Sequence, residues 1–212
     1  MYPDGTGVTR LHTWNAGHCC GRSEDVDVDD VGFLDAVVAD LSERMDLSSD
    51  RVVVAGHSNG AMMAQRWVAE SPLTFGGVFS VAAVADPAFV PDTPTSFVHV
   101  HSVDDPRPPF EGGEAETFLR GESWTASPVM DVVDAWQNAN GCDGDGYGAS
   151  SSGDLDEDVT WTEYETYPVV TMLITLSGSG HAWPGVTDVN ENLVGPPSTI
   201  FSANSELAAF VA

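Results

Sequence analysis

The chain is built around RVVVAGHSNG, the stretch that spans residues 51–60. Residues 52–55 form a continuous apolar run rich in β-branched side chains, which predicts a strand over 51–55 buried on both faces. Gly56 begins a short turn, and residues 61–70 then carry a helical pattern that Pro72 ends. A buried strand, a tight turn and a helix in this order are typical of an α/β fold with a parallel sheet.

The turn itself, residues 56–60, fits the pattern G-x-S-x-G. Between a strand and a helix this pattern predicts a nucleophile elbow with Ser58 as the nucleophile and the backbone N–H of Asn59 as an oxyanion donor. The glycines leave room for a strained serine conformation that exposes the hydroxyl. The alternative is an ordinary turn, because the bare pattern recurs by chance among small residues.

The remaining segments favour a mostly parallel sheet covered by helices, since the apolar runs are continuous and are separated by helical or long connections. Asp29 or Asp30 is expected to cap the first helix, and Ser127 to cap a later one with Pro128 at its first position. The further predicted elements are helices over 30–45, 127–136 and 206–211, strands over 78–84, 96–101, 161–167 and 169–176, and a Gly/Ser/Asp loop over 141–160.

Length and composition bound the class of protein. A chain of 212 residues with 42% apolar residues predicts a single domain over 1–212 with a sizeable core. Its six Trp and nine Phe exclude a disordered chain. No apolar run approaches the roughly 20 residues of a membrane span, so no membrane partner is expected.

The charge balance is strongly acidic, with 33 Asp and Glu against seven Arg, no Lys, and a formal charge of −26. Such a surface repels phosphate backbones, which argues against a nucleic-acid partner. The acids are spread through every segment rather than clustered. This favours adaptation to high salt, where repulsion between carboxylates is screened, over a dedicated cation-binding function.

The three cysteines are Cys19, Cys20 and Cys142. A secreted protein would pair Cys142 with one of the vicinal two, whereas a cytosolic one would keep three thiols, and the sequence leaves both open. His18 beside the vicinal pair lacks a second spaced pair of ligands, so neither a metal site nor any other cofactor is expected. Residues 1–5 have neither the basic region nor the apolar run of a signal peptide.

A nucleophilic serine needs a base, and after an elbow the chain order is serine, acid, histidine. The histidines after Ser58 are His99, His101 and His181. His99 lies inside an apolar strand and is expected to be a packed core residue, while His101 is expected to orient the loop beyond that strand. His181 lies in a Gly/Ser-rich loop directly after a strand, which favours it as the base over a plain surface histidine.

The acid is expected after a strand between the serine and the histidine, where it would fix the imidazole tautomer. The segment over 98–105 ends in two adjacent candidates, Asp104 and Asp105. Either could instead be a simple turn former, and spacing alone does not separate them.

Several blocks, in the same order and over nearly the whole chain, resemble one family. The chain is similar to the polyhydroxybutyrate-depolymerase-like esterases, which include feruloyl and acetylxylan esterases of the LpqC type. The matching blocks are Tyr2-Pro3-Asp4-Gly5, Trp14-Asn15-Ala16-Gly17-His18-Cys19-Cys20-Gly21, Val28-Asp29-Asp30-Val31-Gly32-Phe33-Leu34, Gly56-His57-Ser58-Asn59-Gly60-Ala61-Met62-Met63, Asn140-Gly141-Cys142 and Gly180-His181-Ala182-Trp183-Pro184-Gly185.

The resemblance implies an α/β-hydrolase fold and a secreted carboxylic-ester hydrolase that acts on polyesters or on feruloyl and acetyl esters of polysaccharides. It implies Ser58 as nucleophile and His181 as base. The family segment around the acid aligns with residues 101–110 in a register that selects Asp105, although Ser102 and Phe110 replace its usual glycine and tyrosine.

Two tryptophans in the matching blocks, Trp14 and Trp183, are candidate substrate-binding residues. They could form an aromatic wall for an acyl group or a sugar, and packing in the core is the alternative.

The front of the chain departs from the family. Family members begin with strands ahead of the block at 2–5, and one of these strands leads into a His-Gly turn that supplies the second oxyanion donor. A chain that starts at Met1 would lack these strands and this donor, so turnover lower by about 10²–10³ is expected. This favours a piece of a longer esterase, and the alternative is an inactive relative that binds a polymer or glycan.

Overall fold

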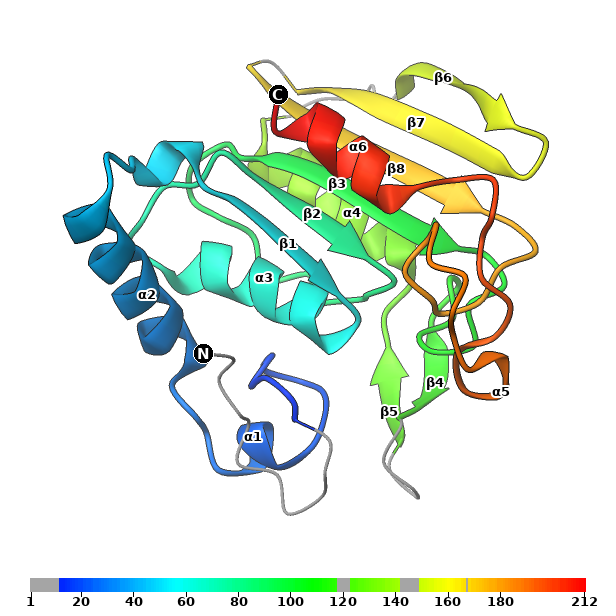
Figure 1. The fold of residues 1–212 in the computed structure, drawn as a ribbon, viewed down its shortest axis with the longest axis horizontal. Helices are drawn as coiled ribbons and strands as arrows, with labels where there is room; N and C mark the ends of the chain where they lie inside the picture. The colour runs from blue at the N-terminus through cyan, green and yellow to red at the C-terminus, as the bar shows by residue number, and fades with distance from the viewer. Residues whose placement is uncertain (1–11, 118–122, 142–148, 167) are drawn as a thin grey trace.

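The computed structural model describes residues 12–117, 123–141, 149–166 and 168–212 (Figure 1). The Tyr2-Pro3-Asp4-Gly5 block and Cys142 lie outside the described residues, so expectations that rest on them stay predictions. The described residues form a six-stranded sheet, a separate two-stranded sheet, and helices that pack on both faces of the larger sheet.

The larger sheet is mostly parallel, with the strand order β1-β2-β3-β8-β7-β6. Its parallel neighbours are β1 (Val53–His57), β2 (Gly77–Val81), β3 (Ser96–Ser102) and β8 (Val169–Leu176). Two antiparallel strands, β7 (Val159–Thr166) and β6 (Ala149–Asp156), extend it beyond β8. The smaller sheet pairs β4 (Gly113–Glu116) with β5 (Ser123–Ala126). A mostly parallel sheet flanked by helices confirms the predicted fold class.

Alternate residues of the central strands divide the core into two layers. Val78 and Phe97 pack against α2 (Asp30–Arg44), α3 (Asn59–Glu70) and α4 (Val129–Ala139). Phe79 and Val98 pack on the opposite face with α6 (Ala203–Phe210), and Figure 1 shows α6 in front of the sheet and α4 behind it. The short helices α1 (Arg22–Asp25) and α5 (Glu191–Val194) lie in connecting segments. No helix within the described ranges is long and apolar enough to cross a bilayer.

Helix ends follow local chemistry closely. Asp29 caps α2 by accepting a hydrogen bond from the backbone N–H of Gly32, and α3 ends at Glu70 with Ser71 as its C-cap just before Pro72, as predicted. The predicted start of α4 is one residue early, because Pro128 has an extended ψ of 145° and is itself the N-cap. α6 begins at Ala203, three residues before the predicted start, since Ser202 caps it.

Two further predictions are wrong. β1 is only partly buried, with Ala55 exposed, because within the described residues it pairs with β2 alone and lies at the sheet edge. By contrast, every residue of β2 is buried. The predicted loop over 141–160 contains β6, whose polar Ser/Gly/Asp sequence carries no strand signal and which forms through its ladder with β7.

Candidate active site

The turn between β1 and α3 holds Ser58 in a backbone conformation that side-chain-bearing residues rarely adopt. Its φ is 54° and its ψ is −129°, and its N–H donates to the carbonyl of Val81 at 2.9 Å. Gly56 is required by this turn, because a Cβ at that position would lie 2.4 Å from the carbonyl oxygen of Gly60. Asn59 begins α3, so its N–H belongs to the first helical turn, whose amides have no acceptor within the helix.

Ser58, His181 and Asp105 form one hydrogen-bonded line. The Nε2 atom of His181 lies 2.8 Å from Oγ of Ser58, and its Nδ1 atom lies 2.8 Å from Oδ2 and 3.1 Å from Oδ1 of Asp105. An ionised carboxylate only accepts hydrogen bonds, so Nδ1 carries the proton and Nε2 of the neutral ring is the acceptor for the serine hydroxyl. The structure therefore brings together all three residues predicted for proton transfer.

The sheet explains this meeting of residues that lie 123 positions apart. Ser58 follows β1, Asp105 follows β3 and His181 follows β8. All three strands are parallel, so their carboxyl ends lie at the same edge of the sheet.

The two candidate acids have different surroundings. Asp105 is 3% exposed and accepts a hydrogen bond from the backbone N–H of Arg107 as well as from His181. Asp104 points elsewhere: its Oδ2 accepts from the backbone N–H of Gly178 at 2.8 Å. Of the two carboxylates, Asp105 is the one hydrogen-bonded to the imidazole, and this geometry favours it as the acid.

His57 supports the loop that carries His181. Its Nε2–H donates to the carbonyl oxygen of His181 at 2.8 Å, and its ring lies 5.0 Å from the His181 ring. Burial, together with the neighbouring His181, lowers the pKa of His57 to about 4. At neutral pH the ring is therefore uncharged and can serve as a fixed donor to the loop.

Close backbone packing also fixes the loop of His181. The N–H of His181 donates to the carbonyl of Val194 at 2.5 Å, and that of Gly180 donates to Pro196 at 2.7 Å. A Cβ on Gly180 would lie 2.2 Å from the same Val194 oxygen, so only glycine lets the two segments approach this closely.

A cavity of about 300 Å³ opens onto Ser58. Among the described residues its wall is largely aromatic and apolar, and it includes the guanidinium of Arg107. Side chains around it include Trp14, Trp124, Met62, Pro108, His57, Arg107 and the vicinal cysteines Cys19 and Cys20. This volume suits a small acyl group beside the serine hydroxyl.

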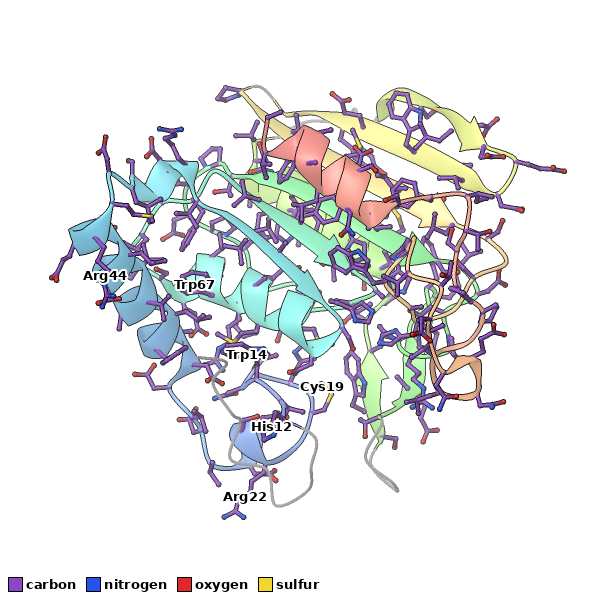
Figure 2. The ribbon with its side chains drawn as sticks, in the orientation of Figure 1. His12, Trp14, Cys19, Arg22, Arg44 and Trp67 are labelled. Carbon is purple, nitrogen blue, oxygen red and sulfur yellow. A yellow bond between two sulfur atoms is a disulfide. The ribbon has the colours of Figure 1, made fainter. Side chains whose placement is uncertain are left out.

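The side-chain amide of Asn59 joins this wall to the nucleophile turn. Its Oδ1 accepts from the N–H of Trp14 at 2.7 Å, and its Nδ2 donates to the carbonyls of Trp14 and Cys19 at 3.2 and 3.0 Å. Figure 2 shows Trp14 and Cys19 on the segment that runs below α3 in that view. The sequence predicts the backbone N–H of Asn59 as a donor, whereas these contacts of its side chain depend on tertiary structure.

The two predicted tryptophans have different places. Trp14 lines the cavity, whereas Trp183 does not and packs in the core layer beneath α6. The Trp183 ring lies 6.2 Å from that of His57 and 6.3 Å from that of Phe79, and its N–H donates to Asn204. For Trp183 the alternative of core packing is therefore the observed one.

The vicinal cysteines are joined to each other by a disulfide, Cys19 to Cys20. Cys142 lies outside the described residues, so the pairing considered for a secreted protein stays a prediction. Within the described ranges no three His, Cys, Asp or Glu side chains gather as metal ligands.

Trp124 and Arg107 also line the cavity, and the sequence does not predict them there. Trp124 lies on β5 and contacts the ring of His18 edge-on at 5.1 Å, a pairing between segments more than 100 residues apart. No local pattern marks either residue, because the wall is assembled by tertiary contacts alone.

Comparisons with known proteins place the chain among hydrolases. The sequence pattern of the prolyl oligopeptidase family (Peptidase S9) matches residues 2–109, about half of the chain. The chain is also 32% identical over 170 residues to a protein named "Putative esterase NocK" from Nocardia uniformis subsp. tsuyamanensis. That alignment covers 74% of this chain and 49% of the relative, so the chain spans about half the length of the curated protein it matches.

The observed sheet agrees with this family match, since a mostly parallel sheet covered by helices is the α/β-hydrolase architecture. By its sequence and its fold, the chain belongs to the prolyl oligopeptidase family.

Proposed function

We propose that the protein is a serine esterase that hydrolyses carboxylic esters through a covalent acyl-enzyme. The observation that carries the proposal is the line of 2.8 Å contacts from Ser58 Oγ to His181 Nε2 and from His181 Nδ1 to Asp105 Oδ2. In this arrangement a neutral imidazole accepts the serine proton as the oxygen attacks. Two carboxylate oxygens hold that imidazole in the tautomer which the step requires.

The reaction proceeds in two halves. Ser58 attacks the ester carbonyl, His181 takes the proton and then gives it to the leaving alcohol, and the acyl group stays on the serine. Water then attacks the acyl-enzyme, again losing a proton to His181, and the carboxylic acid leaves. Asp105 stabilises the imidazolium in both halves, and the backbone N–H of Asn59 is the proposed donor to the oxyanion.

For the substrate we propose esters of short or aromatic acids, in polyesters such as polyhydroxybutyrate or as feruloyl and acetyl groups on polysaccharides. The resemblance to the polyhydroxybutyrate-depolymerase-like family supports this class. The cavity supports it too, since Trp14 and Trp124 line a space of about 300 Å³ beside Ser58. The same resemblance supports an extracellular place of action.

Peptide hydrolysis is the second candidate, because the family match is to prolyl oligopeptidases. The same three residues would serve an amide, whose poorer leaving group makes greater demands on the acid role of His181. No described side chain distinguishes an amide substrate from an ester, so a direct assay decides.

The test uses a fluorophosphonate probe and a substrate panel. Wild-type protein should be labelled at Ser58, and Ser58→Ala should lose both labelling and hydrolysis of p-nitrophenyl acetate. Acetylated xylan, feruloyl esters, hydroxybutyrate oligomers and prolyl peptides then rank the substrate classes by kcat/KM. A folded wild-type protein that is neither labelled nor active would overturn the proposal and favour a non-catalytic polymer- or glycan-binding protein.

A further inference from the structure

A chain of side-chain hydrogen bonds crosses the core from α4 to the loop that carries Asp105. It joins Trp136, Gln65, Ser80, His99 and His101 to the carbonyl of Pro108, with successive distances of 3.1, 3.1, 3.0, 3.1 and 3.1 Å. All five side chains are at most 1% exposed. The proposed hydrolysis uses none of them directly.

The two ends of this hydrogen-bond network fix which atom donates at each step. The indole N–H of Trp136 can only donate, and the carbonyl of Pro108 can only accept. Gln65 therefore accepts with Oε1 and donates with Nε2 to Ser80, whose hydroxyl donates onward to Nδ1 of His99.

The two histidines complete the chain as neutral rings. Nε2–H of His99 donates to Nδ1 of His101, and Nε2–H of His101 donates to Pro108. Burial lowers the pKa of both rings, so each carries one proton, and the neighbours leave only Nε2 to hold it.

The last side chain of this hydrogen-bond network, His101, lies close to Asp105. Nε2 of His101 lies 3.9 Å from Oδ2 of Asp105, and its acceptor Pro108 lies three residues beyond that aspartate. Between them, the backbone N–H of Arg107 donates to Oδ1 of Asp105. The hydrogen bond from His101 to Pro108 thus holds the loop that orients the Asp105 carboxylate toward His181.

We propose that His101 is a positioning residue for the reaction, and that Gln65, Ser80 and His99 lock its tautomer so that its Nε2–H holds the Asp105 loop in register. This inference rests on the proposed esterase function. A purely apolar core of the same shape would be about as stable, because buried polar networks gain little net free energy. What the network adds is a single orientation for the loop of the acid, which a loose apolar contact does not provide.

The first arm of the test does not depend on activity. Nitrogen-15 shifts of the imidazole rings report tautomers, and His99 and His101 should both appear as neutral Nε2–H rings between pH 6 and 8. Ser80→Ala removes the hydroxyl that donates to Nδ1 of His99 without changing the packing volume much. It should weaken the preference for Nε2–H in His99, while the carbonyl of Pro108 still favours Nε2–H in His101. Detection of charged rings, or of Nδ1–H tautomers in wild type, would overturn the proposal.

The second arm compares His101→Leu with His101→Gln, since Gln retains a side-chain N–H for Pro108. His101→Leu should lower kcat by about 10-fold to 100-fold through misplacement of Asp105. KM should stay within about twofold, because His101 does not line the cavity. His101→Gln should recover most of the lost rate.

The outcomes separate the two proposals. A wild-type protein without turnover overturns the esterase function and the positioning role together. An active wild type with an equally active His101→Leu, or with a rise in KM alone, overturns the positioning role and leaves the esterase intact. If His101→Leu does not fold, His101→Asn takes its place, because its shorter amide does not reach the carbonyl of Pro108, and an unchanged kcat in that variant also overturns the role.

Discussion

The side chain of Asn59 pairs with the peptide of Trp14 at both of its polar atoms, accepting from the N–H at 2.7 Å and donating to the carbonyl at 3.2 Å. Asn59, which directly follows the proposed nucleophile, is thus hydrogen-bonded to Trp14, which lines the cavity. Distance and orientation between the serine hydroxyl and this wall are set by one amide, so the two are expected to move as a unit.

Substitution of Asn59 tests this coupling. Asn59→Ala keeps the backbone N–H proposed for the oxyanion but loses three hydrogen bonds to the segment of Trp14 and Cys19. At a net 0.5–1.5 kcal/mol each, we expect kcat/KM for p-nitrophenyl butyrate to fall by about 10-fold or more. Asn59→Asp has the same size and places an anionic oxygen against two carbonyls, so it should lose at least as much. Wild-type kinetics in both variants would contradict the coupling.

The buried histidines predict how stability depends on pH. His57, His99 and His101 all have lowered pKa values in the folded protein, that of His57 about 4, whereas unfolded histidines titrate near 6.5. Between these values the unfolded chain binds more protons. The free energy of unfolding should therefore fall as pH decreases below about 6.5, by up to about 1.4 kcal/mol per pH unit for each histidine.

Denaturant titrations at pH 7.5, 6.5, 5.5 and 4.5 measure this slope. His57→Gln keeps a side-chain donor for the carbonyl of His181 and removes one titrating group. Its slope should be smaller by about one proton. Asp30, whose pKa burial raises, acts in the opposite sense only at more acid pH. An identical slope in wild type and His57→Gln would show that His57 titrates alike in both states.

The cavity wall predicts acyl specificity. Trp124→Ala removes an aromatic face from the cavity, and a stacked aromatic ring contributes about 0.5–1.5 kcal/mol beyond its buried area. We expect KM for methyl ferulate to rise by at least about threefold, with KM for p-nitrophenyl acetate little changed. The acetyl ester is the control within the same variant. Equal losses on both esters would point to a general disturbance of the site instead.

The charge balance predicts a response to salt. With 33 acidic residues against seven basic ones, self-repulsion opposes the compact state until ions screen it. Raising NaCl from about 0.1 M to about 2 M should therefore raise Tm, by about 2–4 °C for each kcal/mol gained in a chain of this size. Sucrose at matched osmolality is the control, because it stabilises without screening. Equal gains in salt and sucrose would argue against adaptation to high salt.

Local signals predict much of this fold. The end of α3 at Glu70 and the cap at Asp29 each depend on residues within a few positions. The helix ends where the sequence predicts it, and Asp29 is one of the two predicted caps, whereas the strand before Ser58 lies two residues beyond its predicted range. β6 does not follow from its sequence, because its polar residues gain a strand conformation only by pairing with β7. The edge position of β1 depends on which segments are present to pair with it, which no local pattern encodes.

The site divides in the same way. Motifs mark Ser58 and His181, and the family resemblance selects Asp105. The contact between Asp105 and the imidazole is seen only in the structure. The place of Trp124 in the cavity wall and the hydrogen bonds of Ser80 depend on contacts between distant segments. Such contacts produce no periodic pattern in the sequence. In the sequence Trp183 and Trp14 are equally good aromatic candidates for substrate binding. Only the structure shows that Trp183 packs against the core.

The pairing of β8 with β3, from Phe97 opposite Thr171 to Ser102 opposite Leu176, has a consequence during synthesis. The imidazole of His181 reaches the serine only after this last parallel strand has left the ribosome and docked beside a strand made some 70 residues earlier. A nascent or C-terminally clipped chain that carries the complete elbow therefore has no His181 beside Ser58 until about its final fifth is in place.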